Sequence, residues 1–250
     1  MPEARKPKVA FFDFASCEGC QIEFTNYGDA AILELLEHID IVEFREAMTE
    51  TTTERIDIAF VEGSYTREED RARLEEIRAR SRTVVAYGAC ACTGGVNALR
   101  NHQDDFAQYV YGDDSRMPHL RSGTARPISA AIQVDHEVMG CPISKDELLN
   151  VISNLLHGTQ YVPPTYPVCV QCKRRENICR YDEGDHCMGQ VARAGCGAPC
   201  PADGIPCEAC RGFVLDANLP ALEKVLMQRA GFSQRRAVSK SRMFTANLRS

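Results

Sequence analysis

Thirteen cysteines, unevenly placed along 250 residues, constrain this chain more than any other feature. Five of them stand far apart within the first 141 residues, whereas eight fall between positions 169 and 210. The odd count, the length and the lack of an apolar leader after the first methionine argue against a secreted disulfide scaffold. We therefore expect a cytoplasmic protein whose cysteines bind metal.

The composition also excludes two kinds of partner. The formal net charge is -6, and the lysines and arginines are scattered rather than gathered into the basic patch that nucleic-acid binding requires. The sequence has no run of about 18 apolar residues, the length that a membrane-spanning helix needs. We expect no nucleic acid among the partners and no direct insertion into a membrane.

Strand and helix patterns alternate through residues 1–158. Short apolar runs typical of buried parallel strands lie at 8–14, 39–44, 56–61, 83–87 and 128–134. Helical patterns lie between them at 30–37, 67–80 and 145–156, the last behind a capping residue, Ser144. This alternation predicts an α/β domain with a doubly wound parallel sheet.

The character of the sequence changes in residues 159–250. Pro163, Pro164 and Pro167 interrupt any helix, and the stretch that follows is rich in cysteine, glycine and charge. Such a segment buries little apolar surface, so we expect a small, mostly irregular domain that metal binding holds together. A helix is predicted at 219–230, and the basic tail beyond it is interpreted as a solvated terminus.

Four cysteines of the first domain follow predicted strands. Cys17 and Cys20 come after the first strand, Cys90 after the fourth and Cys141 after the last. The carboxyl ends of parallel strands meet at one edge of a sheet, which predicts that these four thiolates converge there. The fifth cysteine, Cys92, is interpreted as a small buried side chain rather than a ligand.

Eight further cysteines form two local groups of four. The first has the spacing C-x2-C-x6-C-x7-C, and the second C-x3-C-x6-C-x2-C; their residues are Cys169, Cys172, Cys179 and Cys187, then Cys196, Cys200, Cys207 and Cys210. C-x2-C pairs also build tetrahedral zinc sites. The dipeptides Cys141-Pro142 and Cys200-Pro201, however, are typical of the end of a ferredoxin cluster motif. Spacing alone thus favours iron-sulfur clusters and leaves zinc open.

Several motifs resemble one known family, the small subunits of nickel-iron hydrogenases. They are CEGC after the first strand, VEGS at 61–64, GACACTGG at 88–95, GCP at 140–142 and GIPCEAC at 204–210. The resemblance covers nearly the whole chain. It is closest to the cytoplasmic branch that includes the methyl-viologen-reducing hydrogenases of methanogens and the sulfhydrogenases.

The resemblance implies a flavodoxin-like domain at 1–158 and a ferredoxin-like domain with the tail at 159–250. It also implies three 4Fe-4S clusters: a proximal one on Cys17, Cys20, Cys90 and Cys141, a distal one on Cys169, Cys172, Cys179 and Cys187, and a medial one on Cys196, Cys200, Cys207 and Cys210. In many membrane-bound relatives a histidine and a proline stand where this chain has Cys169 and Cys200. Three cubane clusters are therefore implied.

By the same resemblance, the chain is an electron-transfer subunit of a hydrogenase and holds neither nickel nor a catalytic residue. Its implied partners are a nickel-iron large subunit and a further redox subunit, which is a flavin, nicotinamide, heterodisulfide reductase or ferredoxin module. Two alternatives stay open: a quinone-reductase subunit of the complex I type, and a zinc-stabilised scaffold protein. Glu18 and Glu23 lie beside proximal cysteines, and we interpret them as solvated or capping carboxylates rather than proton carriers.

Overall fold

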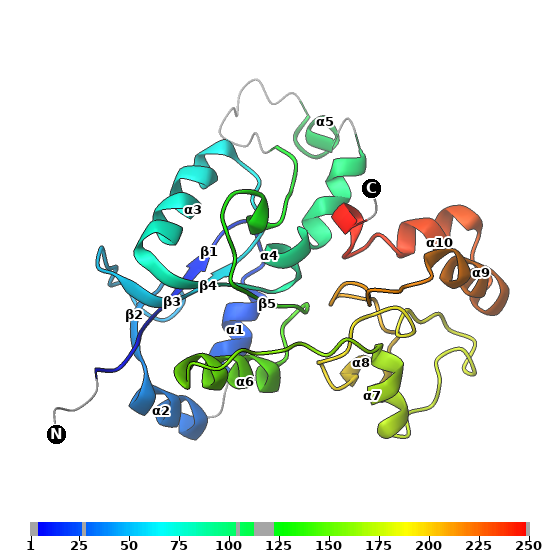
Figure 1. Cartoon of the computed structure of the whole chain (residues 1–250). Coiled ribbons are helices and arrows are strands. Elements are labelled where there is room, and N and C mark those ends of the chain that lie inside the picture. The colour runs from blue at the N-terminus through cyan, green and yellow to red at the C-terminus, as the bar shows by residue number, and fades with distance from the viewer. Residues whose placement is uncertain (1–4, 27–28, 104–105, 113–122, 249–250) are drawn as a thin grey trace.

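A five-stranded parallel sheet forms the centre of the first region (Figure 1). The computed structural model describes residues 5–26, 29–103, 106–112 and 123–248. The strands are β1 (Lys8–Asp13), β2 (Asp40–Phe44), β3 (Ile56–Glu62), β4 (Ser81–Tyr87) and β5 (His136–Val138), in the order β2-β1-β3-β4-β5. All neighbouring strands pair in parallel, and this order is that of flavodoxin. The expected flavodoxin-like α/β fold is confirmed.

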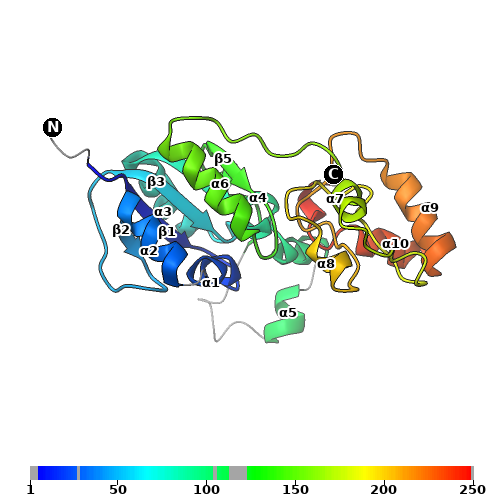
Figure 2. The same ribbon diagram turned by 90° about the horizontal axis from the view of Figure 1, so that it is seen from below.

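Each face of the sheet has its own apolar core, because successive side chains of a strand point to opposite faces. Ala10 and Phe12 pack on one face with Leu74 of α3 (Glu68–Arg80). Val9 and Phe11 pack on the other face, which is covered by α1 (Gly19–Thr25), α2 (Asp29–His38) and α6 (Lys145–Leu156). Figures 1 and 2 show α3 and α6 on opposite sides of the strands. The sheet region is thus a three-layer structure.

The strand predicted at 128–134 is wrong. A short 3-10 helix, η4 (Ile128–Ala130), occupies part of this segment, and the last strand, β5, begins only at His136. The amides of Ala131 and Ile132 both bond back to the Ile128 carbonyl, at 2.9 and 3.1 Å. Ile128 and Ile132 are buried whereas Ala130 is exposed, and a strand that buried both isoleucines would bury Ala130 on the same face.

Several short helices were not predicted from the sequence, and most of them contain cysteines predicted to bind clusters. They are α1, α4 (Ala89–Thr93), η1 (Val96–His102), α5 (Phe106–Tyr111), α7 (Val168–Arg174), α8 (Pro199–Ala202) and α10 (Gln234–Lys240). Elements of four to seven residues are too short for a periodic apolar pattern, so composition alone did not reveal them. The prediction of a Ser144 cap on α6 is confirmed, because its side chain accepts from the Glu147 amide.

The second region consists of loops, α7, α8 and a pair of helices, α9 (Leu219–Ala230) and α10, which confirms the helix predicted at 219–230. It contains a small apolar core that includes Val168 of α7, Met188 of a loop, Leu226 of α9 and Phe232, which lies between α9 and α10. The segment up to residue 212 therefore shares its core with the helices that follow. His157 to Tyr166 connect the two regions without helix or strand.

The interpretation of the tail as a solvated terminus is wrong. Residues 241–248, here called the C-terminal strap, lie against the sheet region and end in η5 (Ala246–Leu248). Thr93 donates to the Phe244 carbonyl at 2.8 Å, and the Asn247 side chain donates to the Thr93 carbonyl at 2.9 Å. Thr245 and Ala246 are buried. Small side chains let the strap pack closely, a property that the tail's conspicuous charges concealed.

Candidate iron-sulfur sites

The four cysteines predicted to bind the proximal cluster lie close together. Cys17 and Cys20 follow β1, Cys90 lies in α4 directly after β4, and Cys141 follows β5. Burial, and after it the neighbouring Cys141 and Cys17 thiolates, raise the pKa of Cys90 to about 12. Burial also raises the pKa of Cys20, with smaller contributions from Glu62, Cys141 and Cys90. The topology thus brings the four thiols to one edge of the sheet.

Two glycines leave space beside this proximal set. A Cβ atom on Gly88 would lie 2.7 Å from the Cys20 Sγ, and one on Gly95 would lie 2.8 Å from the Cys90 Sγ. Gly88 also has a φ of 87°, which side chains rarely adopt. Four convergent thiols supply the donor set of a cubane cluster, and the glycines beside them leave room for its bulk.

Glu62 is a functional candidate that the sequence analysis did not single out, although it belongs to the VEGS motif. It ends β3, is 2% exposed, and accepts the backbone amides of Cys20 and Gln21 at 3.2 and 3.1 Å. Burial raises the pKa of this carboxyl, while those two amides lower it. Glu62 therefore fixes the turn of α1 that presents Cys20. A charge at the end of the apolar run IDIAFVE was the available clue.

The four cysteines predicted to bind the medial cluster line a cavity of about 140 Å³. Its other walls are mostly apolar and include Ile205 and Phe244. Burial is the main cause that raises the pKa of Cys210 to about 12, and thiolates of the same set, Cys196 and Cys200, add to it. An apolar cavity with a complete set of four thiols fits an iron-sulfur cluster. The residues of this medial set are Cys196, Cys200, Cys207 and Cys210.

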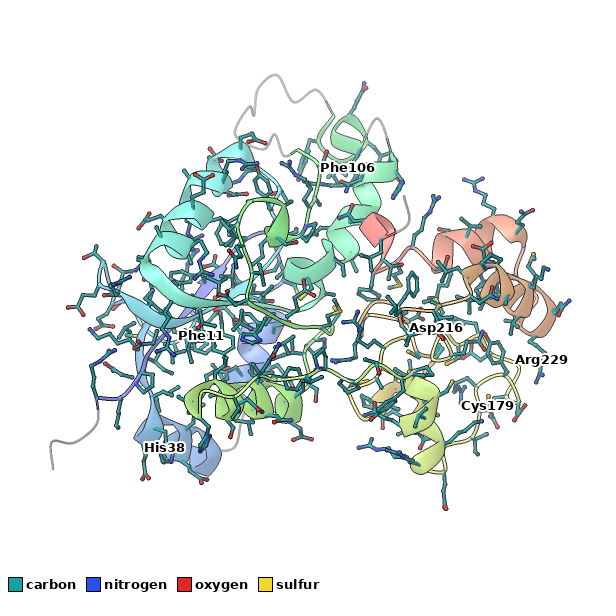
Figure 3. All side chains as sticks on the ribbon, in the orientation of Figure 1. Phe11, His38, Phe106, Cys179, Asp216 and Arg229 are labelled. Atoms are coloured by element: carbon teal, nitrogen blue, oxygen red, sulfur yellow. The ribbon has the colours of Figure 1, made fainter. Side chains whose placement is uncertain are left out.

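The distal set also gathers from separate segments. Cys169 and Cys172 lie on α7, whereas Cys179 and Cys187 lie on the loop that follows. Burial, and after it the Cys187, Cys172 and Cys179 thiolates, raise the pKa of Cys169 to about 11. A Cβ atom on Gly189 would lie 3.5 Å from both the Cys169 and the Cys187 Sγ. Cys179 is exposed, and Figure 3 shows it in the part of the second region that is turned away from the sheet.

The medial set contacts both of the other sets. Cys141 of the proximal set lines the medial cavity, and the Cys207 amide donates to the Cys187 Sγ at 3.4 Å. The medial set therefore lies between the other two. Among the residues that the structure describes, no group of three or more His, Cys, Asp or Glu side chains is tight enough to hold a single metal ion.

Three further residues, Cys92, Glu18 and Glu23, were set apart from the ligands in the sequence. Cys92 is buried in the apolar core, and its Sγ lies 3.5 Å from the Ala86 carbonyl oxygen. Burial raises its pKa well above the usual range. Glu23 forms a 3.6 Å ion pair with Lys145. Glu18 precedes α1, and burial, followed by repulsion from Glu46, raises the pKa of its carboxyl.

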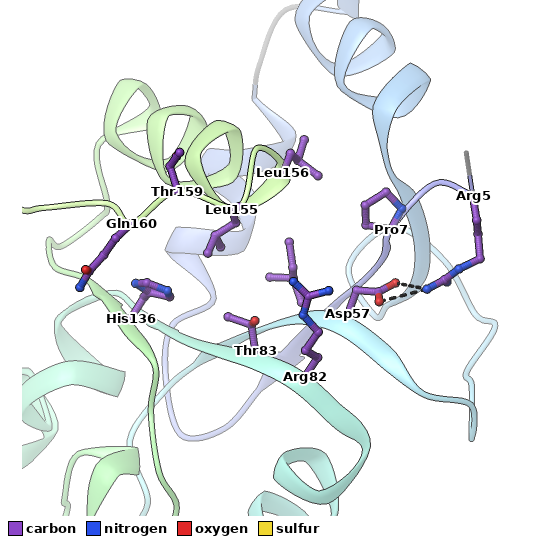
Figure 4. A pocket seen from close by; sticks show the side chains of 12 residues that line it. Arg5, Pro7, Asp57, Arg82, Thr83, His136, Leu155, Leu156, Thr159 and Gln160 are labelled. Carbon is purple, nitrogen blue, oxygen red and sulfur yellow. Dashed lines mark hydrogen bonds and ion pairs between the residues drawn. The ribbon is translucent and has the colours of Figure 1, made fainter. Parts of the chain in front are cut away.

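A separate pocket of about 510 Å³ lies at the amino ends of the strands, opposite the proximal cysteines (Figure 4). Thr83 and His136 contribute from β4 and β5, and the Arg5 to Asp57 ion pair closes one side at 3.0 Å. None of the residues that line it is a cysteine. The pocket is thus remote from the proximal thiols, and its mixed lining defines no reaction.

Comparison with known proteins identifies the chain. The family model described as the NADH ubiquinone oxidoreductase 20 kDa subunit matches residues 17–155, more than half of the sequence. The sulfhydrogenase 2 subunit delta of Pyrococcus furiosus is 33% identical over 222 residues, which cover 88% of this chain and 92% of the relative. The chain belongs to this family, in its nickel-iron hydrogenase branch.

Other hydrogenase subunits agree with this assignment. A vhu-type F420-non-reducing hydrogenase of Methanocaldococcus jannaschii contains a subunit that is 33% identical, with 82% of this chain and 81% of the relative covered. A solved chain of an NAD+-reducing [NiFe]-hydrogenase is 27% identical with a TM-score of 0.57, covering 64% of this chain and 96% of that chain. A match of 222 residues also runs beyond residue 155 into the cysteine-rich region, which the 20 kDa family model does not reach.

Among the described residues, no helix combines the length and the apolar character needed to cross a membrane.

Proposed function

We propose that this hydrogenase small subunit carries electrons between the nickel-iron site of a partner large subunit and an acceptor module, through three 4Fe-4S clusters. The observation that carries the proposal is the grouping of twelve cysteines into three neighbouring sets of four. When bound, each cluster passes one electron at a time. The hydrogenase names of the relatives support the large subunit as a partner.

The chain's own residues perform three tasks in this proposal. The cysteines hold the clusters. Cys17 and Cys141 are exposed at the edge of the sheet, and Cys179 and the medial Cys200 are exposed in the second region. Glu62 orients the backbone at Cys20. Apolar side chains such as Phe244 exclude water from the medial cavity. We infer that electrons enter or leave beside the exposed cysteines of the two outer sets, so the large subunit docks beside Cys17 and the acceptor module beside Cys179.

The proposal keeps the division into a flavodoxin-like domain at 1–158 and a ferredoxin-like domain at 159–250. It also keeps a cytoplasmic location and an acceptor module of the flavin, nicotinamide, heterodisulfide reductase or ferredoxin kind. One relative is named an NAD-reducing hydrogenase and others F420-non-reducing hydrogenases, so the acceptor differs within the family. The acceptor is therefore set by the partner subunit.

Metal analysis of anaerobically purified hydrogenase complex tests the proposal directly. We expect brown protein with about twelve irons bound by this chain, four for each set of cysteines, and no zinc. Dihydrogen should bleach the visible absorption of the clusters as they are reduced. A complex in which this chain binds stoichiometric zinc and no iron would establish the scaffold alternative instead.

A further inference from the structure

Arg211 is a buried cation placed between two of the cysteine sets. It directly follows Cys210, lines the medial cavity together with Cys141 and Cys196, and is only 2% exposed. Among the described residues it is the largest side chain that is fully buried. Burying a guanidinium costs free energy unless its donors are paired, so we expect hydrogen-bond acceptors around it.

Every nitrogen of the Arg211 guanidinium has a partner. The carboxylate of Glu147, on α6 of the sheet region, accepts from both terminal nitrogens at 2.5 and 2.6 Å. Nε donates to the Ala194 carbonyl at 2.9 Å, and Nη1 also donates to the Met139 carbonyl, two residues before Cys141. Glu147 is 5% exposed and additionally accepts the Tyr161 hydroxyl at 2.5 Å. The pair thus joins the two regions beside Cys141 and Cys210.

The backbone is shaped around this pair. A Cβ atom on Gly195 would lie 2.9 Å from the Arg211 Cζ and 3.1 Å from the Glu147 Oε1. Gly195 also has a φ of 125° and directly precedes Cys196. The pair is therefore enclosed by residues that neighbour both the proximal and the medial cysteines.

We propose that Arg211 and Glu147 form a positioning pair that sets the reduction potential of the medial cluster. This inference rests on the proposed electron-transfer function. Reduction adds one negative charge to a cluster, so a nearby cation favours the reduced form and a nearby anion disfavours it. Arg211, whose charge is permanent, is the residue adjacent to Cys210, and Glu147 balances that charge from the sheet region. A buried pair is weak evidence for stability, which leaves electrostatic placement as the better explanation.

A double-mutant cycle that removes the two charges, in the assembled hydrogenase complex, tests the inference. The variants are Glu147→Gln, Arg211→Gln and the double variant, and the readout is the medial midpoint potential followed by electron paramagnetic resonance. We expect Glu147→Gln to raise the potential and Arg211→Gln to lower it. Each shift should be near tenfold in the ratio of reduced to oxidised cluster, or about 59 mV for one electron. The double variant should lie between the two single variants, and Arg211→Lys closer to the wild type than Arg211→Gln.

The matched control is Glu75→Gln, which removes an exposed carboxylate on α3 in an ion pair with Arg71 and should leave the potential unchanged. Shifts of the same sign in both single variants, or wild-type potentials in both with full iron content, would refute the positioning role. If the charge variants lose iron, the medial midpoint potential of a Tyr161→Phe variant tests the inference instead. Loss of its hydroxyl strengthens the carboxylate's field and should lower the potential slightly, whereas an unchanged value counts against the pair. A wild-type complex without iron would instead refute the proposed function itself.

Discussion

The two regions of this small subunit are built around different kinds of core. The sheet region buries continuous apolar layers on both faces of β1, with Phe11 on one side and Phe12 on the other. The core of the second region is small, includes the cysteine Cys207, and packs against three further cysteines, Cys172, Cys187 and Cys196. The cysteine side chains that would bind metal therefore also form part of the apolar core of the second region.

The two regions therefore need different sources of stability. The sheet region can be ordered by hydrophobic burial, at roughly 25 cal/mol for each Å² of apolar surface. The second region has few large apolar side chains before α9, so we expect metal-ligand bonds to supply much of its order. Removing metal and removing apolar contacts should therefore affect the two regions differently.

Removal of the clusters should have the largest effect, and only on one region. Ordering the backbone costs roughly 1 to 2 kcal/mol per residue, which the small core of the second region cannot offset without metal. Limited proteolysis of cluster-free protein, followed by mass spectrometry, should show first cuts within residues 163–212. A fragment near residues 1–158 should survive. Uniform resistance along the cluster-free chain would show that the contrast between the regions is false.

Replacing single cysteines should separate ligands from packing residues within α4. Cys90→Ala should lose about a third of the bound iron, because one of three clusters loses a ligand. Cys92→Ala should keep all of the bound iron, because this thiol lies in the apolar core of the sheet region. Iron per chain, measured after anaerobic purification, checks both variants. Equal iron loss in the two variants would mean that the ligand is misassigned.

Core truncations should depend on metal in one region and not in the other. Leu74 and Leu226 are both fully buried leucines, and Leu→Ala at such a site costs about 2–5 kcal/mol. Leu74→Ala should lower the free energy of unfolding of the sheet region equally with and without clusters. Leu226→Ala should have a measurable cost only in the metal-loaded protein, because the second region is already open without metal.

Denaturant unfolding of both forms, with protease susceptibility as the second readout, measures these costs. Leu33→Ala is the control, since Leu33 is 63% exposed and its loss should change little. A Leu226→Ala cost that is the same in both forms would show that the second region folds without its clusters.

Replacing helix-capping residues should have the smallest effect, a loss of about 1 kcal/mol in the free energy of unfolding. Each region has one such capping residue that can be compared with the other. The Asn218 side chain accepts the Ala221 amide at 2.9 Å at the start of α9, whereas the Ser144 side chain accepts the Glu147 amide at 3.5 Å at the start of α6. The shorter bond predicts a larger cost for Asn218→Ala than for Ser144→Ala. Hydrogen exchange of α9 and α6 in the metal-loaded protein measures both, and the reverse order would contradict the prediction.

The sequence was most informative where the pattern is long or the chemistry is local. Four strands and the helices at 67–80, 145–156 and 219–230 follow from apolar patterns, and the convergence of Cys17, Cys90 and Cys141 follows from parallel topology. The segment 128–134 misled because Ile128 and Ile132 fit a strand and a helical turn equally well, and Pro127 favoured the turn. A three-residue strand such as β5 has no periodicity of its own.

Long-range polar partners could not be predicted. Arg211 and Glu147 are 64 residues apart, and the sequence around either residue does not predict that the other is its partner. Glu62 acts through two backbone amides, which carry no residue-specific pattern. The grouping of cysteines within each set was predictable from spacing, whereas the contacts between sets, such as Cys207 with Cys187, depend on how the loops fold over one another.

The C-terminal strap gives the assembly of the protein a time order. All thirteen cysteines precede residue 241, so the ribosome delivers every thiol before it delivers Phe244 or Asn247. The two hydrogen bonds that join Thr93 to these residues therefore form only after all thirteen thiols have been synthesised. Thr93 ends α4, the helix that carries Cys90, so the contacts that hold this helix in place are completed after its thiol is present.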